Sequence, residues 1–183
     1  MPYRFKQAAL EQEFEQIFAL THRVFAQELG QYPANPAGRL VDKFHHKNRY
    51  VIALDEDHVV GMICYHSEPP FSVEQRLPDL SVLREHGKLI EVRLLAVEPG
   101  HRNGRVMAGL MLEIFSNARH FDSIVISGVA EEVGMYRQMG FRELGPPVRS
   151  GEASFVPMAV KLVDLAERQA RWERLLLKSR TAT

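Results

Sequence analysis

The segment of residues 88–111, KLIEVRLLAVEPGHRNGRVMAGLM, decides the fold that we predict for this chain. Leu89–Val97 is apolar, which predicts a strand, and the polar residues 98–104 follow it as a loop. An amphipathic helix is expected next, because apolar residues recur at a spacing of about 3.6 residues: Val106, Met107, Leu110, Met111, Ile114 and Phe115. A helix that starts after a glycine-containing loop presents unpaired N–H groups and the positive end of its dipole. The segment therefore predicts a phosphate-binding site.

Three basic side chains lie in or next to this loop. His101, Arg102 and Arg105 place positive charge around the backbone amides of Asn103 and Gly104. Backbone donors, a helix N-terminus and arginine together favour a pyrophosphate group. The alternative is an ordinary strand-to-helix turn whose basic side chains face solvent, since glycine in a loop is a weak signal.

The composition is that of an ordinary globular protein, with 45% of the 183 residues hydrophobic and 25% charged. The formal net charge is zero, so neither nucleic acid nor a membrane surface is expected as a partner. The single cysteine, Cys64, excludes an internal disulfide, and we expect it to be a buried structural thiol. The N-terminus lacks the apolar core of a secretory signal, and no apolar run approaches the roughly 20 residues that span a membrane. A cytoplasmic protein is therefore expected.

Hydrophobic spacing predicts further strands at residues 3–7, 49–54, 58–66, 123–129, from 141, and 154–162, with a turn-rich loop at 146–153. Helices are predicted at residues 10–29, 39–47, 81–85, 130–139 and 164–179. The strand–helix–strand units over residues 89–145 predict parallel neighbours with right-handed crossovers. The pattern indicates an α/β (α+β) fold with one domain over residues 1–163. Residues 164–183 are expected to form a C-terminal helix and tail, which packs on the body or serves a homodimer.

Two motifs resemble the GNAT superfamily of N-acyltransferases, and the resemblance covers residues 91–162. LLAVEPGHRNGRVMAGLM resembles that family's strand, pyrophosphate loop and helix, whose usual loop form is (Q/R)-x-x-G-x-(G/A). MYRQMGF, at residues 135–141, is similar to the family's Y-x-x-x-G-F. Arg102 stands at the Q/R position, but Arg105 and Met107 stand at the two small-residue positions, and Gly104 comes one residue early.

The resemblance implies a fold and a donor site. The fold is a GNAT-like mixed, mostly antiparallel central sheet of roughly six or seven strands flanked by helices, with a splayed central strand pair. Acyl-CoA, with acetyl-CoA favoured, is the implied co-substrate, and no metal is expected. The implied donor-binding residues are Leu95, Ala96 and Val97 in the strand and Arg102, Asn103, Gly104, Arg105, Val106 and Met107 after it. The strand amides would then donate to the thioester carbonyl, and the amine would attack it without a covalent enzyme intermediate.

Three side chains are candidates for the chemistry. The resemblance implies that Tyr136 protonates the departing thiolate, which suits a phenol with a reference pKa of about 10; the alternative is a core tyrosine. Glu91 is the candidate base for the amine if partial burial raises its pKa. Its alternative is a salt bridge to Arg93 on the same face of the strand. Arg93 itself can clamp the carboxylate of an acceptor, which fits an amino acid.

A second set of motifs resembles a subgroup. Arg23-Val24-Phe25, Asp42 and Glu91-Val92-Arg93, with GFRELGPPVRSGEASFVPM at residues 140–158, are similar to N-acyl amino acid synthases and acyl-homoserine-lactone synthases. Those enzymes use long acyl chains carried on acyl carrier protein. The tryptophan that acyl-homoserine-lactone synthases have after the first helix is missing from this sequence.

Three functions stay open on the sequence. The favoured one is transfer of an acyl group, acetyl in the first place, from acyl-CoA to the primary amine of a small molecule such as an amino acid. The first alternative is a long-chain N-acyl amino acid synthase-like enzyme, with an acyl-carrier-protein thioester as donor and the carrier protein as partner. The second is a non-catalytic CoA-binding or interaction domain, because Arg105 and Met107 are bulky where a phosphate would approach.

Overall fold

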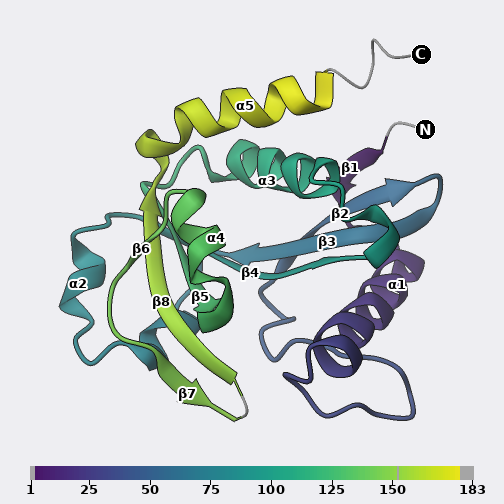
Figure 1. Ribbon diagram of the computed structural model, residues 1–183, viewed down its shortest axis with the longest axis horizontal. Helices are drawn as coiled ribbons and strands as arrows, with labels where there is room; N and C mark the ends of the chain where they lie inside the picture. The colour runs from purple at the N-terminus through teal and green to yellow at the C-terminus, as the bar shows by residue number, and fades with distance from the viewer. Residues whose placement is uncertain (1–2, 152, 178–183) are drawn as a thin grey trace.

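The computed structural model describes residues 3–151 and 153–177, which form one mixed sheet covered by helices (Figure 1). The strands are β1 (Arg4–Gln7), β2 (Arg49–Asp55), β3 (His58–His66), β4 (Leu89–Val97), β5 (Ser123–Val129), β6 (Arg142–Glu143), β7 (Val148–Ser150) and β8 (Ala153–Lys161). The α-helices are α1 (Glu11–Thr21), α2 (Ser81–Arg84), α3 (Arg105–Ala118), α4 (Val133–Gln138) and α5 (Ala166–Leu177). A π-helix, η1 (His22–Glu28), continues α1, and short 3-10 helices are η2 (Ser72–Arg76), η3 (Pro99–His101), η4 (Ala130–Glu132) and η5 (Leu162–Leu165).

The eight strands lie in the order β1-β2-β3-β4-β5-β8-β6, and β7 also pairs with β8. The β4–β5 pair is parallel, and the other pairs are antiparallel. The mixed, mostly antiparallel sheet flanked by helices is the predicted fold class.

Helices bury both faces of the sheet, as the alternation of side chains along β2 shows. Val51 and Ala53 belong to a core that includes Leu110 of α3. Ile52 and Leu54 point the opposite way, into a core that includes residues of α1. Because the residues that face each side of the sheet are apolar, the sequence of β2 is almost continuously apolar. In Figure 1, α3 and α1 accordingly lie on opposite sides of β2 and β3.

The helix α3 is held closely between the sheet and the C-terminal helix. A Cβ atom added at Gly61 of β3 would lie 2.5 Å from Cγ1 of Val106, so the glycine allows the close approach of α3. On the outer side of α3, Trp172 of α5 stacks on Phe115 with ring centroids 5.3 Å apart. The predicted C-terminal helix therefore packs on the body of the molecule, although its predicted end near Ser179 lies outside the described residues.

Two helix predictions were wrong in part. The helix expected over residues 10–29 is α-helical only to Thr21 and continues as η1, and Gly30 follows with φ of +62°. Residues 39–47 form turns instead of a helix. The reason is that Asp42 is turned inward: its Oδ1 accepts from the N–H of Phe44 at 2.7 Å, and its Oδ2 accepts from Arg93.

Two strand predictions were also incomplete. The turn-rich loop of residues 146–153 contains β7, an eighth strand where six or seven were expected, because a three-residue polar strand leaves no periodic signal. We also expected parallel neighbours throughout residues 89–145. β4 and β5 are such neighbours, but β8 inserts between β5 and β6, since all seven residues of β5 pair with β8.

Candidate active site

The site is built around a separation between β4 and β5. Their parallel pairing covers only Leu89–Glu91, whereas β4 remains paired with β3 as far as Val97. Leu94 has a left-handed backbone (φ +52°), and the register with β3 shifts at this point, which identifies a β-bulge. Beyond Glu91 the backbone edge of β4 therefore no longer pairs with β5, and we call the region between the two diverging strands the gap. In Figure 1 the two halves of the sheet run in clearly different directions, as the predicted splayed strand pair requires.

The start of α3 lies at the end of β4, where a phosphate was predicted to bind. Gly104 precedes the helix in the left-handed conformation (φ +79°), which favours glycine. The first helical hydrogen bond runs from the N–H of Ala108 to the carbonyl of Gly104, at 3.0 Å. Oδ1 of Asn103 accepts from the N–H of Arg105 at 3.1 Å. The amides of Val106 and Met107 in the first turn keep the orientation that suits an anion.

Arg102 is tied to another part of the chain. Its Nε donates to the carbonyl of Val97 at 2.9 Å, and its two terminal nitrogens donate to the carboxylate of Glu28 at 2.5 and 2.6 Å. The paired guanidinium lowers the pKa of Glu28, and the same hydrogen bonds raise the pKa of Arg102. This bidentate pair fastens η1 to the loop, so a donor phosphate would have to share or displace Glu28 to reach Arg102.

The two bulky residues at the small-residue positions do not lie across the helix start. The guanidinium of Arg105 lies 5.7 Å from the ring centroid of Tyr3, next to β1. Val106 is fully buried in the core. Met107 is partly buried and lines a cavity between α3, α4 and α5. Their backbone amides thus remain at the start of the helix.

Tyr136 lies on α4 beside the gap. A Cβ atom added at Gly128 of β5 would be 2.7 Å from Cε2 of Tyr136, so the ring rests on the backbone of the strand. Burial raises the pKa of Tyr136, although a hydrogen bond with the backbone of Val129 partly offsets this. The phenol therefore keeps its proton at neutral pH and can donate it.

Glu91 differs from its prediction. Its carboxylate is fully buried and accepts from Nε2 of His66 at 3.0 Å, from both N–H and Oγ of Ser72 at 2.8 Å, and from the N–H of Val73 at 2.9 Å. Desolvation alone would raise its pKa, but these hydrogen bonds and the charge of Arg93 outweigh it and lower the pKa. The expectation of a raised pKa is wrong, because every oxygen of the carboxylate is occupied by donors.

Arg93 forms the predicted contact with Glu91 and a stronger one that the sequence did not predict. Its Nη1 lies 3.7 Å from Glu91, whereas its Nη2 donates to Oδ2 of Asp42 at 2.7 Å. Burial opposes the charge of Arg93, but Asp42 and Glu91 raise its pKa above the ordinary value. The guanidinium also lies 4.7 Å from the ring centroid of Phe44. Its buried Nε finds no hydrogen-bond partner among the described residues.

Residues 16–161, from within α1 to the last residue of β8, match the model of the FeeM N-acyl amino acid synthase family. The chain belongs to this family. The FeeM-family chain is therefore an N-acyltransferase, and both resemblances that the sequence suggested are confirmed, the GNAT superfamily and its N-acyl amino acid synthase subgroup. Among curated proteins, no sequence matches it.

Solved structures similar to the FeeM-family chain share its fold at low identity. BjaI, a CoA-dependent acyl-homoserine lactone synthase, is 20% identical with a TM-score of 0.72, and the match covers 91% of this chain and 82% of the BjaI chain. FeeM, an N-acyl amino acid synthase from uncultured soil microbes, is 15% identical with a TM-score of 0.71 and coverage of 89% and 92%. An N-acetyltransferase from Staphylococcus aureus Mu50 is 12% identical with a TM-score of 0.62 and coverage of 88% and 99%.

The structure adds residues that sequence reasoning missed in this FeeM-family chain. Arg76 of η2 is half-buried, its Nη1 donates to the carbonyl of Ser72 at 3.0 Å, and its Nε has no partner among the described residues. Burial first, and then the charge of Arg93, lower the pKa of Arg76. Ser72 also bonds Ser127 of β5 at 3.2 Å. Only the path of the irregular segment 67–88 brings these residues together, and no spacing in the sequence signals it.

The remaining observations concern other candidate roles. Cys64 is fully buried in the core against α1, and burial raises the pKa of its thiol well above the ordinary value. Within residues 3–151 and 153–177, no group of three or more His, Cys, Asp or Glu side chains is arranged to hold a metal ion. None of the helices in that part of the chain has the length and apolar character needed to cross a bilayer.

Proposed function

We propose that this N-acyltransferase transfers an acyl group from acyl-CoA to the amino group of an amino acid or a similar small carboxylate-bearing amine. One observation carries the proposal: features suited to the donor and to the acceptor lie on opposite faces of the sheet, and β4 and β5 separate between them. Gly128 and Tyr136 lie on the face of the sheet that α4 covers, whereas Ser127 contacts η2 on the other face of the sheet. The opposite facing of consecutive residues in β5 explains this arrangement.

The donor side is the start of α3 and the free edge of β4. The amides at the start of α3 suit the pyrophosphate of CoA, and the thioester would extend from there along β4 into the gap. Backbone N–H groups of residues 95–97 that face the gap would hold the developing oxyanion. The solved structure of BjaI with SAM and isopentyl-CoA, which is 18% identical with a TM-score of 0.72, supports CoA as a donor for this fold.

The acceptor side is the cluster of Arg93 and Arg76. The charge of Arg93 contributes to the lowered pKa of Arg76, and two guanidiniums that interact in this way would suit the carboxylate of an amino acid. Asp42 and Glu91 hold Arg93 in place, and Ser72 accepts from Arg76 through its carbonyl. The cluster would bind the carboxylate and direct the amino group toward the gap.

The reaction requires one bond to form and one to break. The amine nitrogen attacks the thioester carbonyl, the C–S bond breaks, and Tyr136 gives its proton to the thiolate. The amine gives up a proton, which returns to Tyr136 through solvent, so that protons balance. Glu91 is fully buried and hydrogen-bonded, so we propose that it positions η2 and Arg93 instead of acting as the base.

A thiol-release assay tests this function. Acetyl-CoA and longer acyl-CoA thioesters would be offered with a panel of amino acids and with the corresponding decarboxylated amines. We expect thiol release with amino acids and at least tenfold less with the decarboxylated amines, because they lack the partner for Arg76 and Arg93. Equal use of both acceptor classes would exclude binding of the acceptor carboxylate by Arg76 and Arg93. No thiol release from any acyl-CoA would exclude acyl-CoA as the donor.

A second donor is the long-chain acyl-carrier-protein thioester. The sequence resemblance to N-acyl amino acid synthases implies this donor, and the family match is compatible with either donor. The same assay with acyl carrier protein distinguishes the two donors. Activity only with the carrier-bound acyl chain would support this second candidate in place of acyl-CoA.

A further inference from the structure

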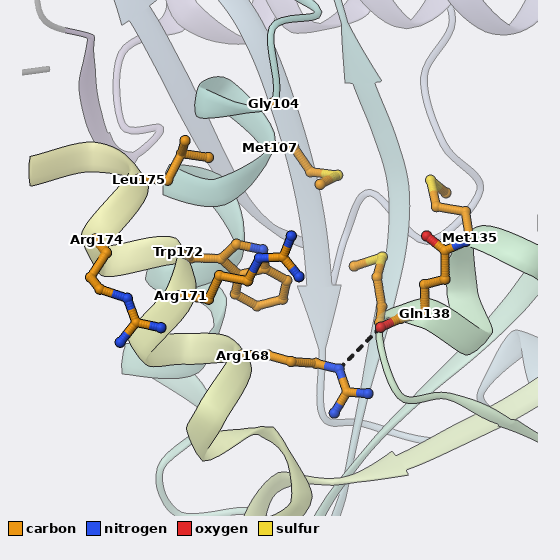
Figure 2. A pocket seen from close by; sticks show the side chains of 10 residues that line it. Gly104, Met107, Met135, Gln138, Arg168, Arg171, Trp172, Arg174 and Leu175 are labelled. Carbon is orange, nitrogen blue, oxygen red and sulfur yellow. Dashed lines mark hydrogen bonds between the residues drawn. The ribbon is translucent and has the colours of Figure 1, made fainter. Parts of the chain in front are cut away.

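A cavity of about 460 Å³ lies where α3, α4 and α5 meet (Figure 2). Gly104 and Met107 contribute the start of α3 to its wall, so the cavity is continuous with the helix end that suits a phosphate. Met135 and Met139 of the α4 region and Trp172 of α5 add apolar surface. This volume is within the range of small-molecule sites, which combine apolar walls with a few polar groups.

The polar groups of this cavity are almost all cationic. Arg168, Arg171 and Arg174 line it from α5 at intervals of three residues, and no acidic residue belongs to the described lining. The spacing places the three arginines on neighbouring positions of one side of the helix. Arginine side chains beside a helix N-terminus, with no carboxylate in the described lining, favour an anionic ligand.

The three arginines differ in what they contact. Nε of Arg168 donates to the carbonyl of Gln138 at 3.1 Å, and its Nη1 donates to the carbonyl of Asp164 at 3.3 Å, so this side chain fastens α5 to the end of α4. In Figure 2 the guanidinium of Arg171 points from α5 beside Trp172 into the space toward α4, whereas Arg174 points away from it. Arg171 is therefore the side chain best placed to bind a ligand in the cavity.

We propose that α5 binds the phosphorylated nucleotide end of acyl-CoA, with Arg171 as the main ligand of the ribose phosphate and Arg168 supporting it. The inference rests on the proposed use of acyl-CoA as donor. CoA carries a pyrophosphate and, beyond it, an adenosine with a separate phosphate. A pyrophosphate at the start of α3 would place the adenosine beside that helix end, where the cavity offers apolar walls for a base and arginine for a phosphate.

Calorimetric titration of the full chain with CoA and with 3′-dephospho-CoA tests the inference, because the two ligands differ by one phosphate. We expect the wild-type protein to bind CoA at least tenfold more tightly, since a charge-assisted hydrogen bond is worth about that factor or more. Arg171→Gln should abolish most of this preference by weakening CoA and leaving dephospho-CoA nearly unchanged. Arg171→Lys should retain part of it. Arg142→Gln on β6, which is exposed and outside the cavity, is the matched control and should bind as the wild type does.

The outcomes separate this inference from the proposed function. If the wild-type protein binds both ligands equally and still releases thiol from acyl-CoA, the proposed function stands and the role of α5 is wrong. If it neither binds CoA nor releases thiol from acyl-CoA, both are wrong. If Arg171→Gln reduces transfer from an acyl-carrier-protein thioester but not from acyl-CoA, the cavity serves the carrier protein and the inference is overturned.

Discussion

Oε2 of Glu91 lies 3.0 Å from Nε2 of His66, and neither side chain is exposed to solvent. The pair joins β4 to β3, and the other donors to Glu91 come from η2, so one carboxylate fixes three segments of the chain. A carboxylate with this many partners is suited to hold the site together and poorly suited to collect a proton from a substrate.

Replacement of Glu91 by glutamine should reduce the free energy of unfolding by about 3 kcal/mol, because it removes a buried charge that neighbouring donors and Arg93 require. The folded-state pKa of Glu91 is lowered, so its contribution is complete above the ordinary value of 4.5 and is lost as pH falls through the lowered value. Urea unfolding near neutral pH and in acid measures this. The difference in the free energy of unfolding between the wild-type protein and Glu91→Gln should shrink in acid, while the exposed Glu131→Gln should have the same free energy of unfolding as the wild type. A constant difference would contradict the assigned role.

Arg76→Gln should raise the KM for an amino-acid acceptor by roughly tenfold or more, because a charge-assisted hydrogen bond to the carboxylate is lost. The kcat should change much less, since Arg76 does not contact the reacting atoms in the proposed mechanism. Steady-state kinetics with an amino acid and its decarboxylated amine provide the readout. Arg84→Gln on the exposed side of α2 is the control. An equal rise in KM for both acceptors would assign Arg76 to the structure of η2 instead.

Tyr136→Phe should lower kcat by about a hundredfold or more while donor affinity stays nearly the same, because only the proton for the thiolate is lost. The defect should shrink with an aryl thioester, whose thiolate leaves without protonation. Because the pKa of Tyr136 is raised, the phenol stays protonated up to a pH above its ordinary pKa of 10. Loss of this proton should therefore not lower the wild-type kcat below pH 10. Tyr65→Phe in the core of β3 is the matched control. An unchanged kcat for Tyr136→Phe would leave Tyr136 as a packing residue.

Gly61→Ala should lower the free energy of unfolding by about 1–3 kcal/mol, because its Cβ would meet Val106 and force α3 away from β3. Val106→Ala in the same chain should recover part of this loss, since it removes the atom that clashes. A double-mutant cycle by chemical denaturation measures the coupling. Strictly additive effects of the two substitutions would show that α3 does not depend on this contact.

Much of the fold could be predicted from the sequence because its signals are local. The hairpin of β2 and β3, the buried strand β5 and the amphipathic α3 all followed from hydrophobic period and turn residues. The loop with Gly104 and the Y-x-x-x-G-F segment with Tyr136 pointed to the superfamily, which the family match confirms. Short polar elements such as β7, and the turns around Asp42, gave no periodic signal and were missed.

The sequence by itself determined the class of fold and the order of most of its elements, since each depends on patterns within a few consecutive turns or strands, and the N-acyltransferase activity that its motifs implied was established by the family match. Only the tertiary structure decided what the charged residues do. Glu91 is buried and hydrogen-bonded because His66 and the irregular segment 67–88 fold over it, and Arg102 is held by Glu28 from a distant helix. Burial and partners set the pKa and availability of a side chain, and those partners come from segments whose approach no local pattern encodes.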